Sequence, residues 1–291
     1  MFRTIFRIAP ATAAFLASAA APAAAQSPAA APAPAAQPAR WHLDGATNRC
    51  VLTRRLEGNP VAATFILRTV PGSSRFDIIL AAPDLPGDLR RTNRPAVLKF
   101  GPAGTPMRSP AAEVDVPGRL GEGVAFGPFG GGFGSEFGRA ATLDIADPQG
   151  RPLASWTIPL AARAAEALAS CEAEKLVDWG ADPAGFEPGA TRPRPAGDPA
   201  SWFSLRDFGL STATQSAGFT AVFRLAVDAQ GRASDCALIE SAGNVDLTGA
   251  CRALTGRARY EPARDAQGNA IRSIAVYVAD YRMEIDYRIT G

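Results

Sequence analysis

Apolar and polar side chains alternate most regularly near the end of the chain. From Phe219 to Val227 every second residue is apolar, and this alternation predicts a half-buried strand. The next residues, Asp228-Ala-Gln-Gly231, supply turn chemistry, with glycine available for a positive φ. Residues 232–241 then predict a returning strand, so that the two strands form a hairpin.

A helix and another strand follow the hairpin. Asn244 can cap a helix that runs through Thr255 and is stopped by Gly256. The turn tetrapeptide recurs at 265–268 and marks a second reversal before a long final strand. One face of that strand is apolar, and the other carries Asp280, Arg282, Glu284, Asp286 and Arg288. The predicted order is therefore strand, strand, helix, strand.

The part of the chain between residues 41 and 180 predicts a β-rich domain with a terminal helix. Its helix spans residues 160–179, where strong helix formers follow Pro159 and end at Gly180. Its strands are short apolar or alternating runs bounded by Gly, Pro and Asp, at residues 50–56, 61–70, 76–82, 96–100 and 141–145. The whole chain is thus expected to be α+β.

A glycine-rich segment, residues 127–138, superficially resembles a phosphate-binding loop. Phe137 stands where the third glycine of G-x-G-x-x-G is required, and no G-K-[ST] follows. We expect a flexible loop whose phenylalanines tuck under the sheet, rather than a nucleotide site.

The N-terminal sequence predicts export. Residues 1–25 combine Arg3 and Arg7, a small-residue apolar run and an A-x-A cleavage site, the order of a secretory signal peptide. An uncleaved inner-membrane anchor is the alternative. The run is mostly alanine, however, and it has fewer strongly apolar residues than a membrane-spanning helix needs. Residues 26–40 are an Ala/Pro-rich linker, and residues 181–200 are a Pro-rich linker between the β-rich domain and a domain at 201–291.

The formal net charge differs between the full chain and the chain from which the predicted signal peptide has been removed. The chain of 291 residues has 30 Lys+Arg and 28 Asp+Glu, a net charge of +2. Removal of residues 1–25 takes two arginines and no acid, which leaves 28 of each sign. A neutral chain offers no excess of cations for nucleic-acid binding, so we expect no nucleic-acid partner.

Four cysteines, Cys50, Cys171, Cys236 and Cys251, form an even set that is expected to pair in an oxidising compartment. Four cysteines allow three pairings. Nearest-neighbour pairing gives Cys50–Cys171 and Cys236–Cys251, one bridge on each side of the second linker. None of them lies in a C-x-x-C, so neither a zinc ribbon nor a thiol redox pair is favoured.

With these elements in place, the C-terminal part resembles the TonB C-terminal domain family. The resemblance covers about residues 202–287. It rests on Gly218, Val227-Asp228 through Gly231-Arg232, Ser241-Ala242-Gly243 with Asp246, the RARYEPA segment at 257–263, and Gly268. Where the family commonly has Tyr-Pro at the start of the domain, this chain has Asp207-Phe208-Gly209.

The resemblance implies that the domain binds a partner by strand addition. In the family, an exposed sheet edge pairs with an extended segment of an outer-membrane transporter, and the final strand is the natural candidate for that edge. The charged face from Asp280 to Arg288 would then set the partner's register or guard the edge against aggregation. Arg257, Arg259 and Arg264 are candidates for holding a partner carboxylate, or are solvated surface.

The expected protein is therefore periplasmic and linked to TonB-dependent transmembrane transport, with an envelope protein as its partner. A TonB-dependent outer-membrane transporter is one such partner. Association of two copies into a homodimer is a further alternative. Contact with the membrane is indirect unless the N-terminal segment is uncleaved. The alternative is an exported structural or interaction module that keeps the TonB-like fold without energy transduction.

An enzyme is not expected, and neither is a cofactor or a metal. His42 is the single histidine and has no G-x-S-x-G, H-E-x-x-H or S-x-x-K motif to complement it. The acid pairs Glu172/Glu174 and Glu284/Asp286 are spaced by two residues. On a helix this spacing points the carboxylates apart, and on a strand it points them outward, so neither predicts a glycosidase dyad.

Overall fold

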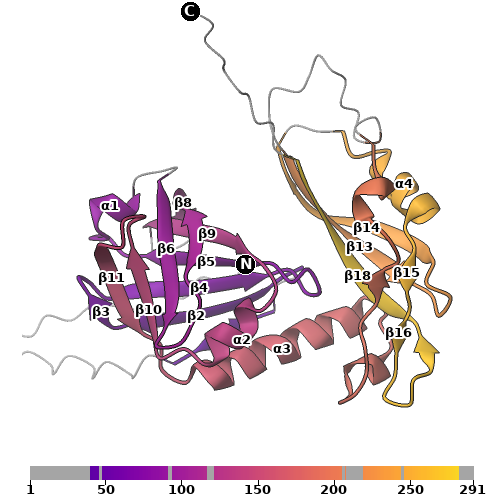
Figure 1. Ribbon diagram of the computed structural model, residues 1–291, viewed down its shortest axis with the longest axis horizontal. Coiled ribbons are helices and arrows are strands. Elements are labelled where there is room, and N and C mark those ends of the chain that lie inside the picture. The colour runs from indigo at the N-terminus through magenta and orange to yellow at the C-terminus, as the bar shows by residue number, and fades with distance from the viewer. Residues whose placement is uncertain are drawn as a thin grey trace, which may run out of the picture. The chain divides into compact units, whose positions relative to one another are not determined.

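The computed structural model describes residues 40–45, 48–90, 94–116, 121–204, 207, 219–243 and 246–281. All of these residues belong to one compact unit, Ala39–Gly291. The predicted signal segment 1–25 and nearly all of the linker 26–40 lie outside the described residues, as do Gly218 and Asn244. The described fold is α+β, with far more strand than helix (Figure 1).

Two antiparallel sheets form the N-terminal part and share one core (Figure 1). The larger sheet has the order β1 (His42–Asp44), β2 (Cys50–Leu56), β4 (Ala63–Thr69), β5 (Phe76–Ala81), β9 (Gly121–Phe129), β8 (Ala112–Val116). The other has the order β3 (Gly58–Asn59), β11 (Pro152–Thr157), β10 (Thr142–Ala146), β6 (Pro95–Gly101), β7 (Met107–Pro110). A short helix, α1 (Gly87–Arg90), lies between β5 and β6 in the chain.

The strands predicted from sequence in this part are confirmed as β2, β4, β5, β6 and β10. Their inward side chains, Leu52, Phe65, Leu80, Leu98 and Leu143 among them, are almost fully buried in the shared core. The strands that the sequence did not reveal are short, lie at sheet edges, or contain proline and glycine. In β9 and β11, which do reach the core through Phe126 and Trp156, glycine and proline hide the alternation.

The glycine-rich segment 127–138 is not a simple loop. β9 runs through it to Phe129, and α2 (Phe133–Gly138) follows. The expectation that its phenylalanines pack inward is confirmed, because Phe126, Phe129, Phe133 and Phe137 are all buried. Phe133 stacks on Phe129 and Phe76 at ring-centroid distances of 5.3 and 4.9 Å. These ring contacts order a sequence whose glycines alone would favour flexibility.

The predicted helix is confirmed as α3 (Ala161–Asp178). It begins after Leu160 and ends at Gly180, whose φ of 103° few other residues tolerate. Its buried face packs against α2 and β2 and is tied to β2 by the Cys50–Cys171 disulfide. Of the three pairings the sequence allowed, the structure thus has the nearest-neighbour one, with Cys236–Cys251 as the second bridge.

The C-terminal part contains the predicted strand, strand, helix, strand order. β13 (Phe219–Val227) and β14 (Ala233–Ala242) form the hairpin, and β18 (Ser273–Tyr281) pairs antiparallel with the other side of β13. The sheet order is β14-β13-β18, with α4 (Ala250–Arg257) following β14 in the chain. Cys236 on β14 is joined to Cys251 on α4, so the helix is fixed to the sheet as expected.

Three details differ from the sequence prediction. The helix is shorter and begins at Ala250, after an Asp246 side chain that accepts from the Thr248 backbone and hydroxyl, and it runs through Gly256, the predicted stop, to Arg257. The final strand begins already at Ser273, and residues 282–291 lie outside the described part of the chain. β13 is buried on both faces rather than one. Its odd-numbered residues face α4, while Ala226 packs against Leu176 at the end of α3.

Residues 181–200, predicted to be a linker, pack against the C-terminal part. Two single 3₁₀ turns, η2 (Pro183–Phe186) and η3 (Pro199–Trp202), are capped by Asp182 and Asp198. Between them β12 (Arg194–Pro195) pairs with β15 (Tyr260–Glu261). A second small ladder joins β16 (Ala263–Arg264) and β17 (Ala270–Ile271), as the predicted reversal at 265–268 requires. Proline therefore shapes this segment without leaving it free of contacts.

One turn design occurs three times. In 147–151, 228–232 and 265–269 an aspartate accepts from the backbone N–H groups two and four residues on, and glycine takes the fourth position with a positive φ. The hydrogen bonds that each aspartate accepts lower its pKa below the usual value, chiefly the backbone ones in Asp147 and Asp228 and the one from the Asn269 side chain in Asp265. The sequence repeat pointed to two copies, and the copy at 147–151 has proline in place of alanine.

Among the residues that the structure describes, no helix is both long enough and apolar enough to cross a membrane.

Gly231 and Gly268 provide a matched test of this turn. Both have φ near 80°, but a Cβ on Gly231 would lie 1.9 Å from the Tyr260 carbonyl oxygen, whereas a Cβ on Gly268 would meet nothing within 4 Å. Gly268→Ala is expected to cost about 1 kcal/mol of unfolding free energy, the usual left-handed penalty for alanine. Gly231→Ala should cost at least about 3 kcal/mol, because the backbone must move. Equal losses in chemical denaturation would contradict the structure.

The disulfides should differ in their effect on stability. Replacing both members of Cys50–Cys171 opens a loop with a sequence separation of 121, against 15 for Cys236–Cys251. The chain-entropy model assigns roughly 5 and 3 kcal/mol to these closures. Because Cys50 and Cys171 are also buried in the core, the paired alanine variant at 50 and 171 should show the larger fall in Tm. A larger fall for the 236/251 variant would contradict this assignment.

Candidate functional site

The final described strand leaves one edge unpaired. β18 lies at the end of the order β14-β13-β18, and no described strand pairs with its outer side. Residues Ile274 to Tyr277 of this strand line a groove of about 580 Å³. We call this cavity the β18 groove. An open strand edge beside a groove of this volume offers backbone donors and acceptors to an extended chain.

One wall of the β18 groove is aromatic. The Trp202 ring lies 5.1 Å from the Tyr260 ring and 5.7 Å from the Tyr277 ring, centroid to centroid. Trp202 and Tyr260 are buried, and Pro193 and Pro195 extend the wall. Burial raises the pKa of both tyrosines, Tyr260 and Tyr277, above the usual value.

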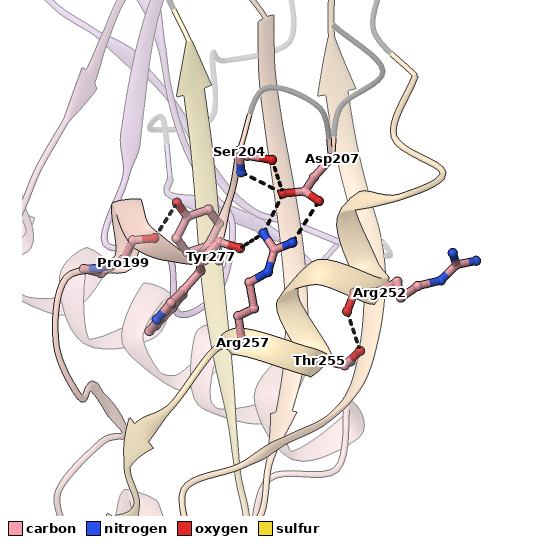
Figure 2. Close-up of polar contacts among 8 residues, drawn as sticks. Pro199, Ser204, Asp207, Arg252, Thr255, Arg257 and Tyr277 are labelled. Carbon is pink, nitrogen blue, oxygen red and sulfur yellow. Dashed lines mark hydrogen bonds and ion pairs between the residues drawn. The ribbon is translucent and has the colours of Figure 1, made fainter.

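A polar cluster holds the aromatic wall in place (Figure 2). Arg257, at the end of α4, donates to Asp207 at 2.7 and 3.3 Å and to the Trp202 carbonyl oxygen at 3.3 Å. Asp207 in turn accepts from the Ser204 backbone and hydroxyl at 2.7 and 2.8 Å. The Tyr277 hydroxyl donates to the Pro199 carbonyl at 3.4 Å. The segment that carries Trp202 is therefore tied to both α4 and β18.

The opposite wall comes from the N-terminal part and consists of small residues together with Phe76 of β5. The loop after β4 contributes Gly72, Ser73 and Ser74, and the start of α2 contributes Gly131, Gly132, Gly134 and Ser135. A Cβ on Gly131 or Gly132 would meet no atom within 4 Å, so this wall leaves the groove open. The two walls therefore differ in chemistry: one has aromatic rings and prolines, and the other has mainly glycines and hydroxyls beside the single ring of Phe76.

A carboxylate from α3 lies in the β18 groove. Glu172 follows the disulfide residue Cys171, and its Oε1 accepts from the hydroxyl of buried Thr69 at 2.8 Å. Thr69 is fixed because it pairs with Cys50 in the β2–β4 ladder. Burial raises the pKa of Glu172, against smaller opposing effects of the Thr69 hydrogen bond and of Arg192. Arg192 lies 3.9 Å above the Phe186 ring centroid and lines the same groove.

The structure places only one of the five charged residues predicted on the final strand. Asp280, near the end of β18, pairs with Arg75 from the N-terminal part at 3.5 Å and accepts from the Thr220 hydroxyl at 3.5 Å. Arg282, Glu284, Asp286 and Arg288 lie outside the described residues. Where it is described, the charged face therefore contacts this chain's own N-terminal part.

The arginines considered as carboxylate ligands have partners within the chain. Arg257 binds a carboxylate in a bidentate manner, but the carboxylate is that of Asp207. Arg259 donates to the Ala258 carbonyl at 2.8 Å, and Arg264 donates to the Gly268 carbonyl at 2.7 Å. Their described roles are to fix the chain around the groove and the turn at 265–269.

An ion pair also fixes the sheet beside the groove. Arg49, just before β2, donates through Nε to Glu240 of β14 at 2.9 Å, and its Nη2 contacts the same oxygen. Asn48 donates to the neighbouring Ile239 carbonyl at 3.4 Å. Together with the Arg75–Asp280 pair, these contacts reach both outer strands of the C-terminal sheet.

The remaining candidate groups are not brought together. His42 is exposed on β1. Glu172 is half-buried while Glu174 is exposed, so the two carboxylates diverge as their spacing predicts. In the described ranges, no group of three or more His, Cys, Asp or Glu side chains is arranged to hold a metal ion.

Sequence reasoning missed most of the β18 groove. Tyr260 lies inside the RARYEPA segment, and Glu172 was considered only as half of an acid pair. Nothing in the local pattern associates Trp202 or the glycines at 131–134 with the final strand, because they are far apart along the chain. The only available signal was the placement of aromatic residues next to prolines in 193–203.

Comparisons of the chain with families of known proteins, with curated proteins and with solved structures find no match.

The groove carboxylate gives a test by pH. Because its folded-state pKa is raised, the charged form of Glu172 destabilises the fold at neutral pH, and this cost disappears as pH falls below the ordinary glutamate value of about 4.3. Glu172→Gln should therefore raise Tm at pH 7, with the gain shrinking as the pH approaches 4. The matched control Glu174→Gln changes an exposed carboxylate on the same helix and should show no such pH-dependent gain. A gain at pH 7 that persists unchanged at pH 4 would argue against burial as its cause.

Proposed function

We propose that this protein is an exported envelope protein that binds an extended segment of a partner by strand addition to the outer edge of β18. The observation that carries the proposal is the unpaired edge of β18 along the β18 groove. A segment entering the groove would form backbone hydrogen bonds with β18 and place alternate side chains on the two walls. The half-buried Tyr277 ring would supply apolar contact, and the buried Trp202 ring packed against it would hold it in place.

The proposed partner is a protein of the cell envelope, such as a TonB-dependent outer-membrane transporter. The resemblance of residues 202–287 to the TonB C-terminal domain supports this choice, together with the strand, strand, helix, strand order. The two disulfides and the signal-like residues 1–25 support a periplasmic location. The signal would direct export, and the linker that follows it would separate it from the folded part.

A non-transport role is the competing proposal. In that case the fold would bind another envelope protein without transmitting energy, and the N-terminal part would contribute to partner choice. The glycine and serine wall of the β18 groove belongs to the N-terminal part, which supports such a contribution under either proposal.

Filling the groove should abolish binding. Gly131 lines the groove and has space for a side chain, whereas its neighbour Gly130 has equal space but does not line the groove. We expect titration calorimetry of the full chain with extended N-terminal peptides of TonB-dependent transporters to show saturable binding. Gly131→Trp should weaken that binding by about tenfold or more, since the added ring competes with the segment. Gly130→Trp is the matched control and should bind like the parent chain.

Crosslinking in intact cells distinguishes the two proposed roles. Capture of a TonB-dependent transporter through a photoreactive residue at Gly131 supports the transport proposal. Capture of other envelope proteins alone supports the competing one. Failure of every peptide to bind, together with no groove-dependent capture, would overturn strand addition at β18 altogether.

A further inference from the structure

The β18 groove contains a carboxylate that the rest of the chain leaves incompletely compensated. Glu172 is half-buried at the groove, and its hydrogen bond from Thr69 occupies Oε1. Among the described residues Glu172 forms no ion pair within 4 Å, because Arg192 stacks on Phe186 and acts on the carboxylate only at longer range. For a half-buried carboxylate with a single hydroxyl donor, the free energy lost on desolvation exceeds the free energy gained from its hydrogen bond.

The position of Glu172 is rigid. Its neighbour Cys171 is bonded to Cys50, and Cys50 pairs with Thr69 in the β2–β4 ladder. The hydroxyl that binds Glu172 is thus held on the same ladder that anchors the helix. One turn further along α3, Leu176 packs against Ile274 of β18. The carboxylate is therefore kept at a constant place beside the strand edge.

We infer that Glu172 is a specificity-determining residue that selects a lysine or arginine side chain in the bound segment. This inference rests on the proposed strand addition and names the chemistry of the segment. Arg192 acts on Glu172 from a distance but forms no ion pair with it, so a cation from the segment would supply the direct, hydrogen-bonded counter-charge, and such a charge-assisted hydrogen bond in a partly desolvated site discriminates strongly. The aromatic wall takes apolar side chains, so the selected segment alternates apolar residues with one basic residue in register with Glu172.

Arg192 sharpens the choice of register. It carries the other charge that lines the groove and lies within electrostatic range of Glu172. A basic side chain is therefore favoured only where it contacts the Glu172 carboxylate on the side away from Arg192. A segment shifted by one residue would also turn its basic side chain to the opposite face. A single position of the segment should therefore show the preference for lysine.

The test uses the full chain with both disulfides intact and capped synthetic peptides of about seven residues, in which valine and threonine alternate. One position at a time carries lysine, glutamine or glutamate, and dissociation constants are measured by calorimetry at low salt. At one position, lysine should bind about tenfold tighter than glutamine, and glutamate should bind weaker than glutamine.

Two variants of the chain separate the role of Glu172 from general charge. Glu172→Gln should remove the lysine preference while retaining binding of the uncharged valine/threonine peptide. Glu174→Gln removes the same charge from the exposed side of the helix and should keep the preference. A lysine preference that is absent, or that survives in Glu172→Gln, overturns this inference and leaves strand addition standing. If no peptide binds the parent chain, strand addition and this inference fail together.

Discussion

The C-terminal end of α3 is the contact on which the arrangement of the described chain depends. The helix is covalently bound to β2 through Cys171 and Cys50, and its last buried side chain, Leu176, packs with Ala226 and Ile274 of the C-terminal sheet. One helix thus belongs to two cores at once. Because Val222 and Ala226 are buried on the second face of β13, the sheet needs this second cover in addition to α4.

The β18 groove follows from that contact. With the second face of the sheet fixed on α3, the edge of β18 lies next to residues contributed by the loop after β4 and by α2. The Arg49–Glu240 and Arg75–Asp280 pairs add polar contacts on the two outer strands. Partly exposed ion pairs contribute little stability individually. We therefore infer that these two pairs orient the C-terminal sheet but do not hold it against α3. The apolar packing of Leu176 supplies the greater share of stability.

Much of the local structure was predictable because short-range chemistry determines it. Turn residues located the reversals at 228–231 and 265–268, helix formers between Pro159 and Gly180 located α3, and alternation located the β13–β14 hairpin. The burial of the second face of β13 was not predicted because Thr220 and Arg224 alternate there with Val222 and Ala226, a pattern typical of a face exposed to solvent. The early start of β18 was missed for a different reason: its residues are apolar on both sides, and alternation vanishes when both faces are buried.

The sequence by itself determined the elements, their order, the even set of cysteines and the charge balance, since each depends on neighbouring residues or on composition. Only the tertiary structure decided that Glu172, Trp202, Tyr260 and the glycines at 131–134 surround one strand edge. It also decided that Arg257 is bound to Asp207 and that Asp280 pairs with Arg75. These relations join residues distant in sequence, and they arise from packing two cores against one helix, which no local pattern records.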